Sequence, residues 1–131
     1  MDKIKQVIII RKDLNMRKGK IASQAAHAAM CFLSRRFQFI EFNAAPGVRA
    51  NLSNPEVEWL KGSFTKIACY VNSLKELEDL HDKAKEAGLE AHIMVDNGDT
   101  EFGGVATATA LAIGPDYSSK IDPITKGLPL L

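Results

Sequence analysis

The sequence lacks the motifs that mark several large enzyme classes. It contains no Gly-x-Gly-x-x-Gly fingerprint, no Walker-type phosphate loop, no Gly-x-Ser-x-Gly nucleophile elbow and no Cys-x-x-Cys pair. These absences argue against a dinucleotide-binding enzyme, a P-loop nucleotide hydrolase, an elbow-type serine hydrolase and a dithiol oxidoreductase.

Histidine and cysteine are scarce. Histidines stand only at positions 27, 81 and 92, without the spacing of a metal site, so we expect neither a metal nor another cofactor. His81 and His92 are expected on a solvated helix face and at a strand edge or surface. Two cysteines, Cys31 and Cys69, make no disulfide framework, and we expect free thiols that fill apolar space.

Long hydrophobic runs are also missing. The longest early run, residues 7–10, is far too short for a signal peptide or a membrane span. A soluble, cytoplasmic protein without a membrane partner is therefore expected. The 131 residues, 46% hydrophobic and 25% charged, fit a single globular domain over residues 1–131.

The formal net charge of +1 hides an asymmetry. Residues 1–50 carry ten Lys and Arg against three acidic residues, whereas residues 51–131 carry seven against thirteen. A basic half suits an anionic partner, and nucleic acid is the commonest large one. Charge alone leaves open that the two surfaces intermingle once the chain folds.

Strand-like and helix-like segments alternate along the chain, which predicts a single α/β domain. Strands are expected over 4–11, 64–71, 91–95 and 107–113, and helices over 20–39, 55–60 and 74–87, with a short helix and an extended piece in 117–131. Residues 43–55, rich in proline and asparagine, are expected to be irregular.

The loop 12–20 carries the strongest signal for a binding site. Four cations, Arg11, Arg17, Lys18 and Lys20, gather where a strand ends and a helix begins. Free N–H groups at a helix start attract anions, so this loop predicts a site for phosphate or another compact anion. The second loop expected at a strand carboxyl end is 96–106.

One polar line interrupts the alanine-rich helix. Lys20, Gln24 and His27 lie within about 40° of one another on a helical wheel. Two interpretations are open: Gln24 and His27 satisfy buried backbone groups, or the line extends the anion site inward.

Asp96 follows an expected strand in a segment rich in glycine and threonine. Its carboxylate is compatible with a general base, an anchor for a lysine, or the first residue of an Asx-turn. Composition does not separate these three roles.

Three segments, in order, resemble the signature blocks of the type II (archaeal and eukaryotic-style) peptidyl-tRNA hydrolases. They are residues 11–27 (Arg-Lys-Asp-Leu-Asn-Met-Arg-Lys-Gly-Lys-Ile-Ala-Ser-Gln-Ala-Ala-His), the pattern Asp96-x-Gly98-x-Thr100, and residues 109–115 (Thr-Ala-Leu-Ala-Ile-Gly-Pro). Residues 59–67 are most similar to bacterial and phage relatives, and residues 121–128 resemble the family's closing segment. The likeness covers most of the chain except 36–55.

The resemblance implies hydrolysis of the ester that joins a stalled peptide to the terminal ribose of tRNA. It also implies a three-layer α/β/α fold with a four-stranded mixed sheet between helices. The basic half would bind the acceptor arm and 3′ end of peptidyl-tRNA. The family is unrelated in fold to the bacterial type of peptidyl-tRNA hydrolase, so that enzyme's catalytic histidine is not carried over.

The resemblance further implies catalytic roles for Lys18, Asp96, Thr100 and Thr109. Our hypothesis is direct attack by water that Asp96 positions or deprotonates. Lys18 would stabilise the oxyanion or bind a phosphate, and the two threonines would donate hydrogen bonds to the water or carbonyl. Substrate-binding roles are assigned to a second set: Arg17, Lys20, Gln24, His27 and Gly98.

The chain departs from the family pattern at Asn97, Asp99 and Glu101. Two carboxylates so close to Asp96 are expected to raise its pKa by like-charge repulsion. The rival hypothesis is a non-catalytic adaptor that binds RNA or protein; retention of all four catalytic positions argues against it. A nucleotide-binding regulator is less favoured, because the chain has no glycine-rich phosphate loop. A homodimer is compatible with the sequence, which does not decide the oligomeric state.

Overall fold

The computed structural model of the chain describes residues 2–38, 50–99 and 101–131. The strands are β1 (Ile4–Arg11), β2 (Lys66–Val71), β3 (Ala91–Asp96) and β4 (Thr107–Tyr117). The helices are α1 (Lys18–Phe37), α2 (Asn54–Lys61), α3 (Leu74–Glu86) and α4 (Ser118–Thr125), with a 3-10 turn η1 (Lys12–Leu14). Thr100 and much of the segment predicted to be irregular, 43–55, lie outside the described residues. The predicted α/β class is confirmed.

The four strands form one mixed sheet in the order β2-β1-β4-β3. β1 and β2 are parallel, whereas β4 runs antiparallel to both β1 and β3. The carboxyl ends of β1, β2 and β3 therefore meet at one edge of the sheet, where β4 begins. This arrangement confirms that the loops after β1 and β3 share one edge.

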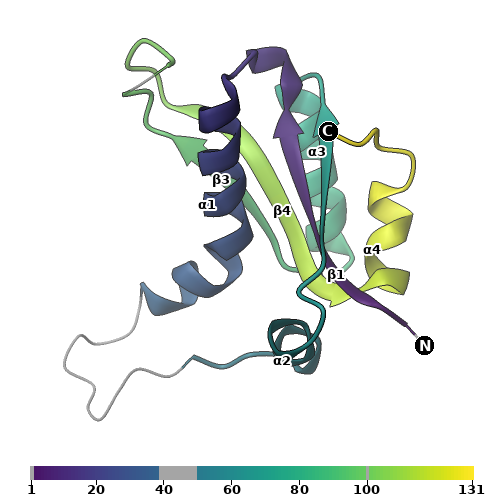
Figure 1. Cartoon of the computed structure of the whole chain (residues 1–131). Helices are drawn as coiled ribbons and strands as arrows, with labels where there is room; N and C mark the ends of the chain where they lie inside the picture. The colour runs from purple at the N-terminus through teal and green to yellow at the C-terminus, as the bar shows by residue number, and fades with distance from the viewer. Residues whose placement is uncertain (1, 39–49, 100) are drawn as a thin grey trace, which may run out of the picture.

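Both faces of the sheet are covered, because the apolar run in β1 alternates between them. Val7 and Ile9 pack with residues of α3 and α4. Ile8 and Ile10 pack on the other face, against α1. In Figure 1, α1 accordingly lies over one face, and α3 and α4 lie on the opposite face. The four-stranded mixed sheet between helices is the arrangement that the family resemblance implied.

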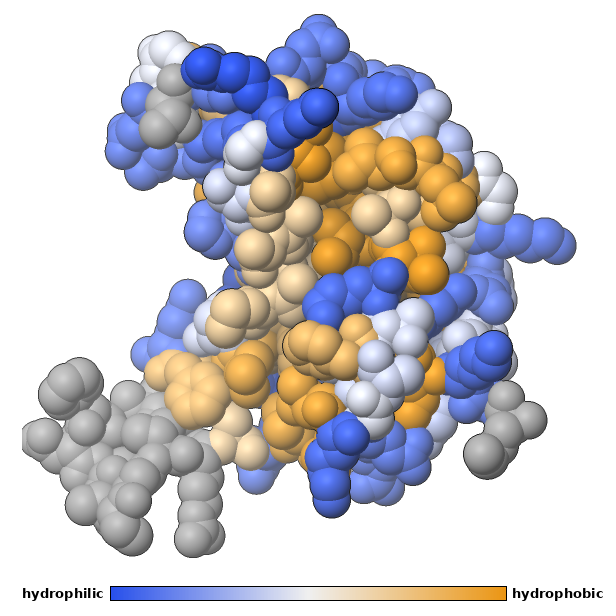
Figure 2. All heavy atoms as spheres, in the orientation of Figure 1, coloured by the Kyte–Doolittle hydropathy of each residue, from blue (hydrophilic) through white to orange (hydrophobic). Residues whose placement is uncertain are grey.

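Alanine brings α1 close to the sheet. Ala28 is fully buried and packs in one cluster with Ala110 and Ala112 of β4. Small residues on both surfaces shorten the distance between helix and strand. Figure 2 shows this helix as a pale, weakly hydrophobic band beside the more hydrophobic residues of the sheet.

The remaining boundaries differ little from the predicted ones. α1 begins two residues before the predicted start, and β4 extends to Tyr117. α2 is capped by Ser53: its hydroxyl accepts from Glu56 N–H, and the Glu56 carboxylate accepts from Ser53 N–H. This reciprocal pair is a capping box.

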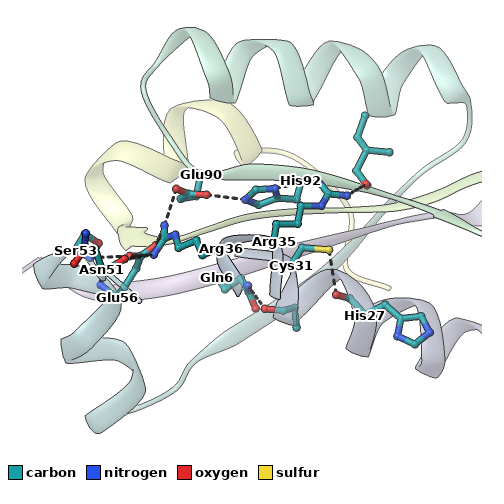
Figure 3. A network of polar contacts seen from close by, with 12 residues as sticks. Gln6, His27, Cys31, Arg35, Arg36, Asn51, Ser53, Glu56, Glu90 and His92 are labelled. Carbon is teal, nitrogen blue, oxygen red and sulfur yellow. Dashed lines mark hydrogen bonds and ion pairs between the residues drawn. The ribbon is translucent and has the colours of Figure 1, made fainter. Parts of the chain in front are cut away.

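A charged network ties α1, α2 and β3 together away from the loops of interest (Figure 3). Arg36 of α1 donates to both carboxylate oxygens of Glu56 at 2.7 Å and to Glu90 at 2.7 Å. Glu90 also contacts His92, whose other ring nitrogen lies 3.0 Å from Arg35. Glu56 is 1% exposed, so this pairing compensates a buried charge.

Two further expectations concern cysteines and membranes. Cys31 and Cys69 are buried free thiols, as predicted. None of the helices in the described ranges is long and apolar enough to cross a membrane.

Candidate active site

Polar side chains from three elements meet where β1 and β3 end. Asp96 is the last residue of β3, Lys20 and Gln24 lie in the first two turns of α1, and Thr109 lies near the start of β4. The sheet topology explains the meeting, since α1 begins shortly after β1 ends and packs against β3 and β4.

Asp96 is the centre of this group. Its Oδ1 accepts from Lys20 Nζ at 2.7 Å and from Gln24 Nε2 at 3.3 Å, and its Oδ2 accepts from Gly98 N–H at 2.8 Å. The side chains of Asp96 and Lys20 are 11% and 12% exposed. Two of the three roles left open by the sequence are thus realised together: the carboxylate anchors a lysine and closes an Asx-type turn.

The pKa of Asp96 is lowered, and the hydrogen bond from Lys20 is the main cause. The Gly98 N–H and the positive charges of Lys20 and His27 act in the same direction, while desolvation opposes them. The expected rise in this pKa from Asp99 and Glu101 is therefore wrong. Glu101 turns toward Arg17 and pairs with its guanidinium at 3.0 Å, and Asp99 is exposed.

Gln24 connects Asp96 to a hydroxyl buried under α1. Gln24 is 3% exposed, and its Oε1 accepts from the Thr109 hydroxyl at 2.5 Å. Thr109 is fully buried, with Met94 O a second neighbour of its hydroxyl at 3.3 Å. The interpretation that Gln24 and His27 satisfy buried backbone groups is wrong, because Gln24 bonds to two side chains and the His27 residue is exposed.

The other cations at the start of α1 face solvent. Lys18 is the first residue of the helix and is exposed, with no hydrogen bond or ion pair to any other residue that the structure describes. Arg17 is 84% exposed despite its contact with Glu101. The N-cap residue, Arg17, makes no capping hydrogen bond with its side chain, so it satisfies none of the first N–H groups of the helix in that way.

The sequence did not reveal the Lys20–Asp96 pair. Lys20 was predicted to bind substrate, and the structure pairs its 12%-exposed side chain with a carboxylate 76 positions further along the chain. Phe102 was also missed; its ring centroid lies 5.8 Å from Lys20 Nζ. The sequence held two hints, the polar line on α1 and the possibility that Asp96 anchors a lysine, but neither identified the two residues as partners.

Other titratable groups lie elsewhere. His81 contacts Asp82 on α3, and His92 sits on the edge strand β3, as expected for a strand edge. Within the described ranges, no group of three His, Cys, Asp or Glu residues is placed to hold a metal ion. A hollow of about 940 Å³ opens at the opposite edge of the sheet, where Lys5 pairs with Asp122, and is remote from Asp96.

Known proteins resemble the chain over nearly its whole length. The family model described as peptidyl-tRNA hydrolase PTH2 matches residues 4–131. The peptidyl-tRNA hydrolase of Methanocaldococcus jannaschii is 40% identical, over 98% of this chain and 100% of the relative. That of Methanothermobacter thermautotrophicus is 40% identical, over 98% of this chain and 100% of the relative. A probable peptidyl-tRNA hydrolase 2 of Dictyostelium discoideum is 35% identical over 96% of this chain and 54% of its own length.

A solved structure of a protein of unknown function from Agrobacterium tumefaciens strain C58 has a similar fold. Its TM-score is 0.58 at 15% identity, and the match covers 100% of this chain and 99% of the other. At that identity the likeness concerns the fold alone. The family model and the relatives carry the assignment: the chain belongs to the peptidyl-tRNA hydrolase PTH2 family.

Proposed function

We propose that this protein hydrolyses peptidyl-tRNA, releasing the peptide and free tRNA. Membership of the PTH2 family supports the reaction. The observation that carries the assignment to a site is the Lys20–Asp96–Gln24 group, which lies beside the exposed cations that begin α1. Anionic RNA and a reactive ester would then be held at the same edge of the sheet.

The reaction needs no covalent intermediate. The oxygen of a water forms a bond to the ester carbonyl carbon, the bond from that carbon to the ribose oxygen breaks, and a proton passes to the departing oxygen. Asp96 is ionised at neutral pH, and the hydrogen bond from Lys20 lowers its pKa below the ordinary value. A carboxylate with a lowered pKa is a weak base but a good acceptor, so we assign Asp96 to positioning the water.

Lys18 is assigned to the oxyanion or the adjacent phosphate. Its ammonium is exposed at the first position of α1, where the helix dipole and uncapped N–H groups add to the positive potential. Arg17 is assigned to a phosphate of the acceptor arm, since 84% of its side chain faces solvent.

Three residues are assigned supporting roles. Thr109 is a positioning residue, because a fully buried hydroxyl reaches substrate only through Gln24. Lys20 holds Asp96 in place and lowers its pKa, in addition to any contact with RNA. Gly98 donates to the carboxylate through a backbone position with φ of 86°. His27 remains a proposed RNA contact on the exposed side of α1, and Thr100 keeps its proposed catalytic role.

The test is release of free tRNA from a purified N-blocked aminoacyl-tRNA. Wild-type protein is expected to release tRNA, and Asp96→Ala is expected to lose that activity while still binding tRNA. Tight, salt-sensitive binding of tRNA by the wild type without release would instead support the adaptor hypothesis.

A further inference from the structure

A small hollow opens at the carboxyl end of β1, beside the start of α1. Its volume is about 280 Å³. Seven residues line it: Ile10, Arg11, Lys12, Asn15, Met16, Ile21 and Leu131. Ile10 and Met16 are buried at 0% and 7% exposure. Pockets for drug-sized ligands run from about 300 to 1,000 Å³, so this one suits a single ring system or side chain.

Two adjacent residues of α1 link the hollow to the catalytic group. Lys20 bonds to Asp96, and Ile21, the next residue, lines the hollow. Successive helical residues point about 100° apart, and a helix with its side chains is about 10–12 Å across. The hollow and Asp96 are therefore contacted from adjacent sides of the same turn of α1.

The rim of the hollow is polar and cationic above an apolar floor. The Arg11 guanidinium is fixed in place by Asp13 at 2.7 Å and by the Ala108 carbonyl at 3.0 Å. A fixed guanidinium plane is a stacking surface for a base. Asn15 adds a carboxamide able to donate and accept, and Lys12 lies exposed with its Nζ 4.3 Å from the Tyr70 ring centroid.

Charge favours a nucleotide over a peptide side chain as the occupant. Asp13 neutralises Arg11, and Lys12 adds an exposed positive charge at the rim. Figure 2 shows a hydrophilic cap at this end of the molecule, where η1 and the start of α1 lie, above the hydrophobic surface of the sheet. An apolar floor under a cationic rim matches a nucleobase attached to a phosphodiester.

We propose that this hollow receives the nucleobase of the 3′-terminal adenosine of tRNA, while the ester on its ribose lies at Asp96. The inference rests on the proposed hydrolase function and adds the part of the substrate that is recognised beside it. The enzyme would then bind the substrate at two points beside the first turn of α1, the base in the hollow and the ester at Asp96.

The test compares two small esters of the same N-acetylated amino acid, one on adenosine and one on a ribose that carries a methoxy group in place of the base. Wild-type protein is expected to have a kcat/KM at least tenfold higher for the adenosine ester. Ile21→Trp, which fills the hollow, is expected to abolish that preference. Ala26→Trp places the same ring at an exposed position of α1 outside the hollow and is expected to retain it.

A second variant covers the case in which Ile21→Trp does not fold. Asn15→Gly removes the carboxamide and suits the backbone, whose φ is 52° at this position, so it is expected to reduce the preference without unfolding the protein. Equal rates of the wild type on both esters, or equal losses on both in each variant, would overturn the inference.

Binding of the dinucleotide CpA separates this inference from the proposed function. CpA bound by wild type and Ala26→Trp but not by Ile21→Trp supports the base site even if no ester is cleaved. If the wild type releases tRNA but wild type and Ile21→Trp bind CpA equally well, the hydrolase function stands and the base site is rejected.

Discussion

The hydrogen bond between Thr109 and Gln24 gives the sharpest prediction, because both residues are buried. Thr109→Val keeps the shape of the side chain and removes only the hydroxyl. Gln24 is 3% exposed, and its Oε1 then loses the hydrogen-bond donor that it has among the described residues. An unsatisfied buried acceptor costs about 1–3 kcal/mol of unfolding free energy.

The same change is expected to lower activity through Gln24. Its amide also donates to Asp96, so an amide that turns to find a new partner disturbs the catalytic carboxylate. A loss of about 1.4 kcal/mol in the transition state corresponds to a tenfold lower kcat. Single-turnover release of tRNA measures this loss, and urea unfolding measures the loss in stability.

A double-mutant cycle with Gln24→Leu decides whether Thr109 acts only through Gln24. If it does, Thr109→Val adds little to Gln24→Leu in either measurement, and the coupling energy reaches about 1 kcal/mol or more. If the losses in unfolding free energy of the two single variants add to within about 0.5 kcal/mol and their losses in kcat multiply, Thr109 does not act through Gln24 and has a direct role.

Three other predictions test separate parts of the structure. The pKa of Glu90 is lowered to about 2, mainly by the hydrogen bond with His92, so its contribution to stability is complete above its ordinary pKa of 4.5 and is lost as the pH falls toward 2. The unfolding free energies of wild type and Glu90→Gln in urea should therefore converge over that interval, and a constant difference between them would contradict the prediction. Arg17→Ala should weaken tRNA binding and reduce the slope of the logarithm of the binding constant against log salt concentration by about 1, and should change the free energy of unfolding by less than about 1 kcal/mol. An unchanged slope would mean that Arg17 does not contact a phosphate. Gly98→Ala should impair folding and activity, because its Cβ would lie 2.4 Å from Val105 O at a φ of 86°. Gly103→Ala, at a φ of 57° with open space around the added Cβ, should have a smaller effect. Equal decreases in the temperature of unfolding for the two variants would mean that φ alone determines the effect.

Local signals in the sequence predicted the strands and helices well. The apolar run in β1 and the alanine-rich sequence of α1 each depend on residues a few positions apart. Periodicity and capping are local properties, so boundaries came within a few residues.

The catalytic group was only partly predictable, because its contacts join distant parts of the chain. The residue types at Lys20, Gln24 and Asp96 were identified, but not that they bond to one another. The predicted rise in the pKa of Asp96 counted its neighbours in sequence, whereas the partner that dominates is Lys20, brought alongside by the sheet. Burial of Thr109 likewise depends on how closely α1 approaches β4.

The central claim is that the carboxylate of Asp96 takes part in the hydrolysis of peptidyl-tRNA. Single-turnover release of tRNA by Asp96→Asn tests it most directly, since asparagine keeps the size of the side chain and removes the charge. Asp99→Asn, an exposed position in the same loop, is the matched control. The account predicts a rate about 10²–10⁴ lower for Asp96→Asn and a nearly unchanged rate for the control; near-full turnover by Asp96→Asn would contradict it.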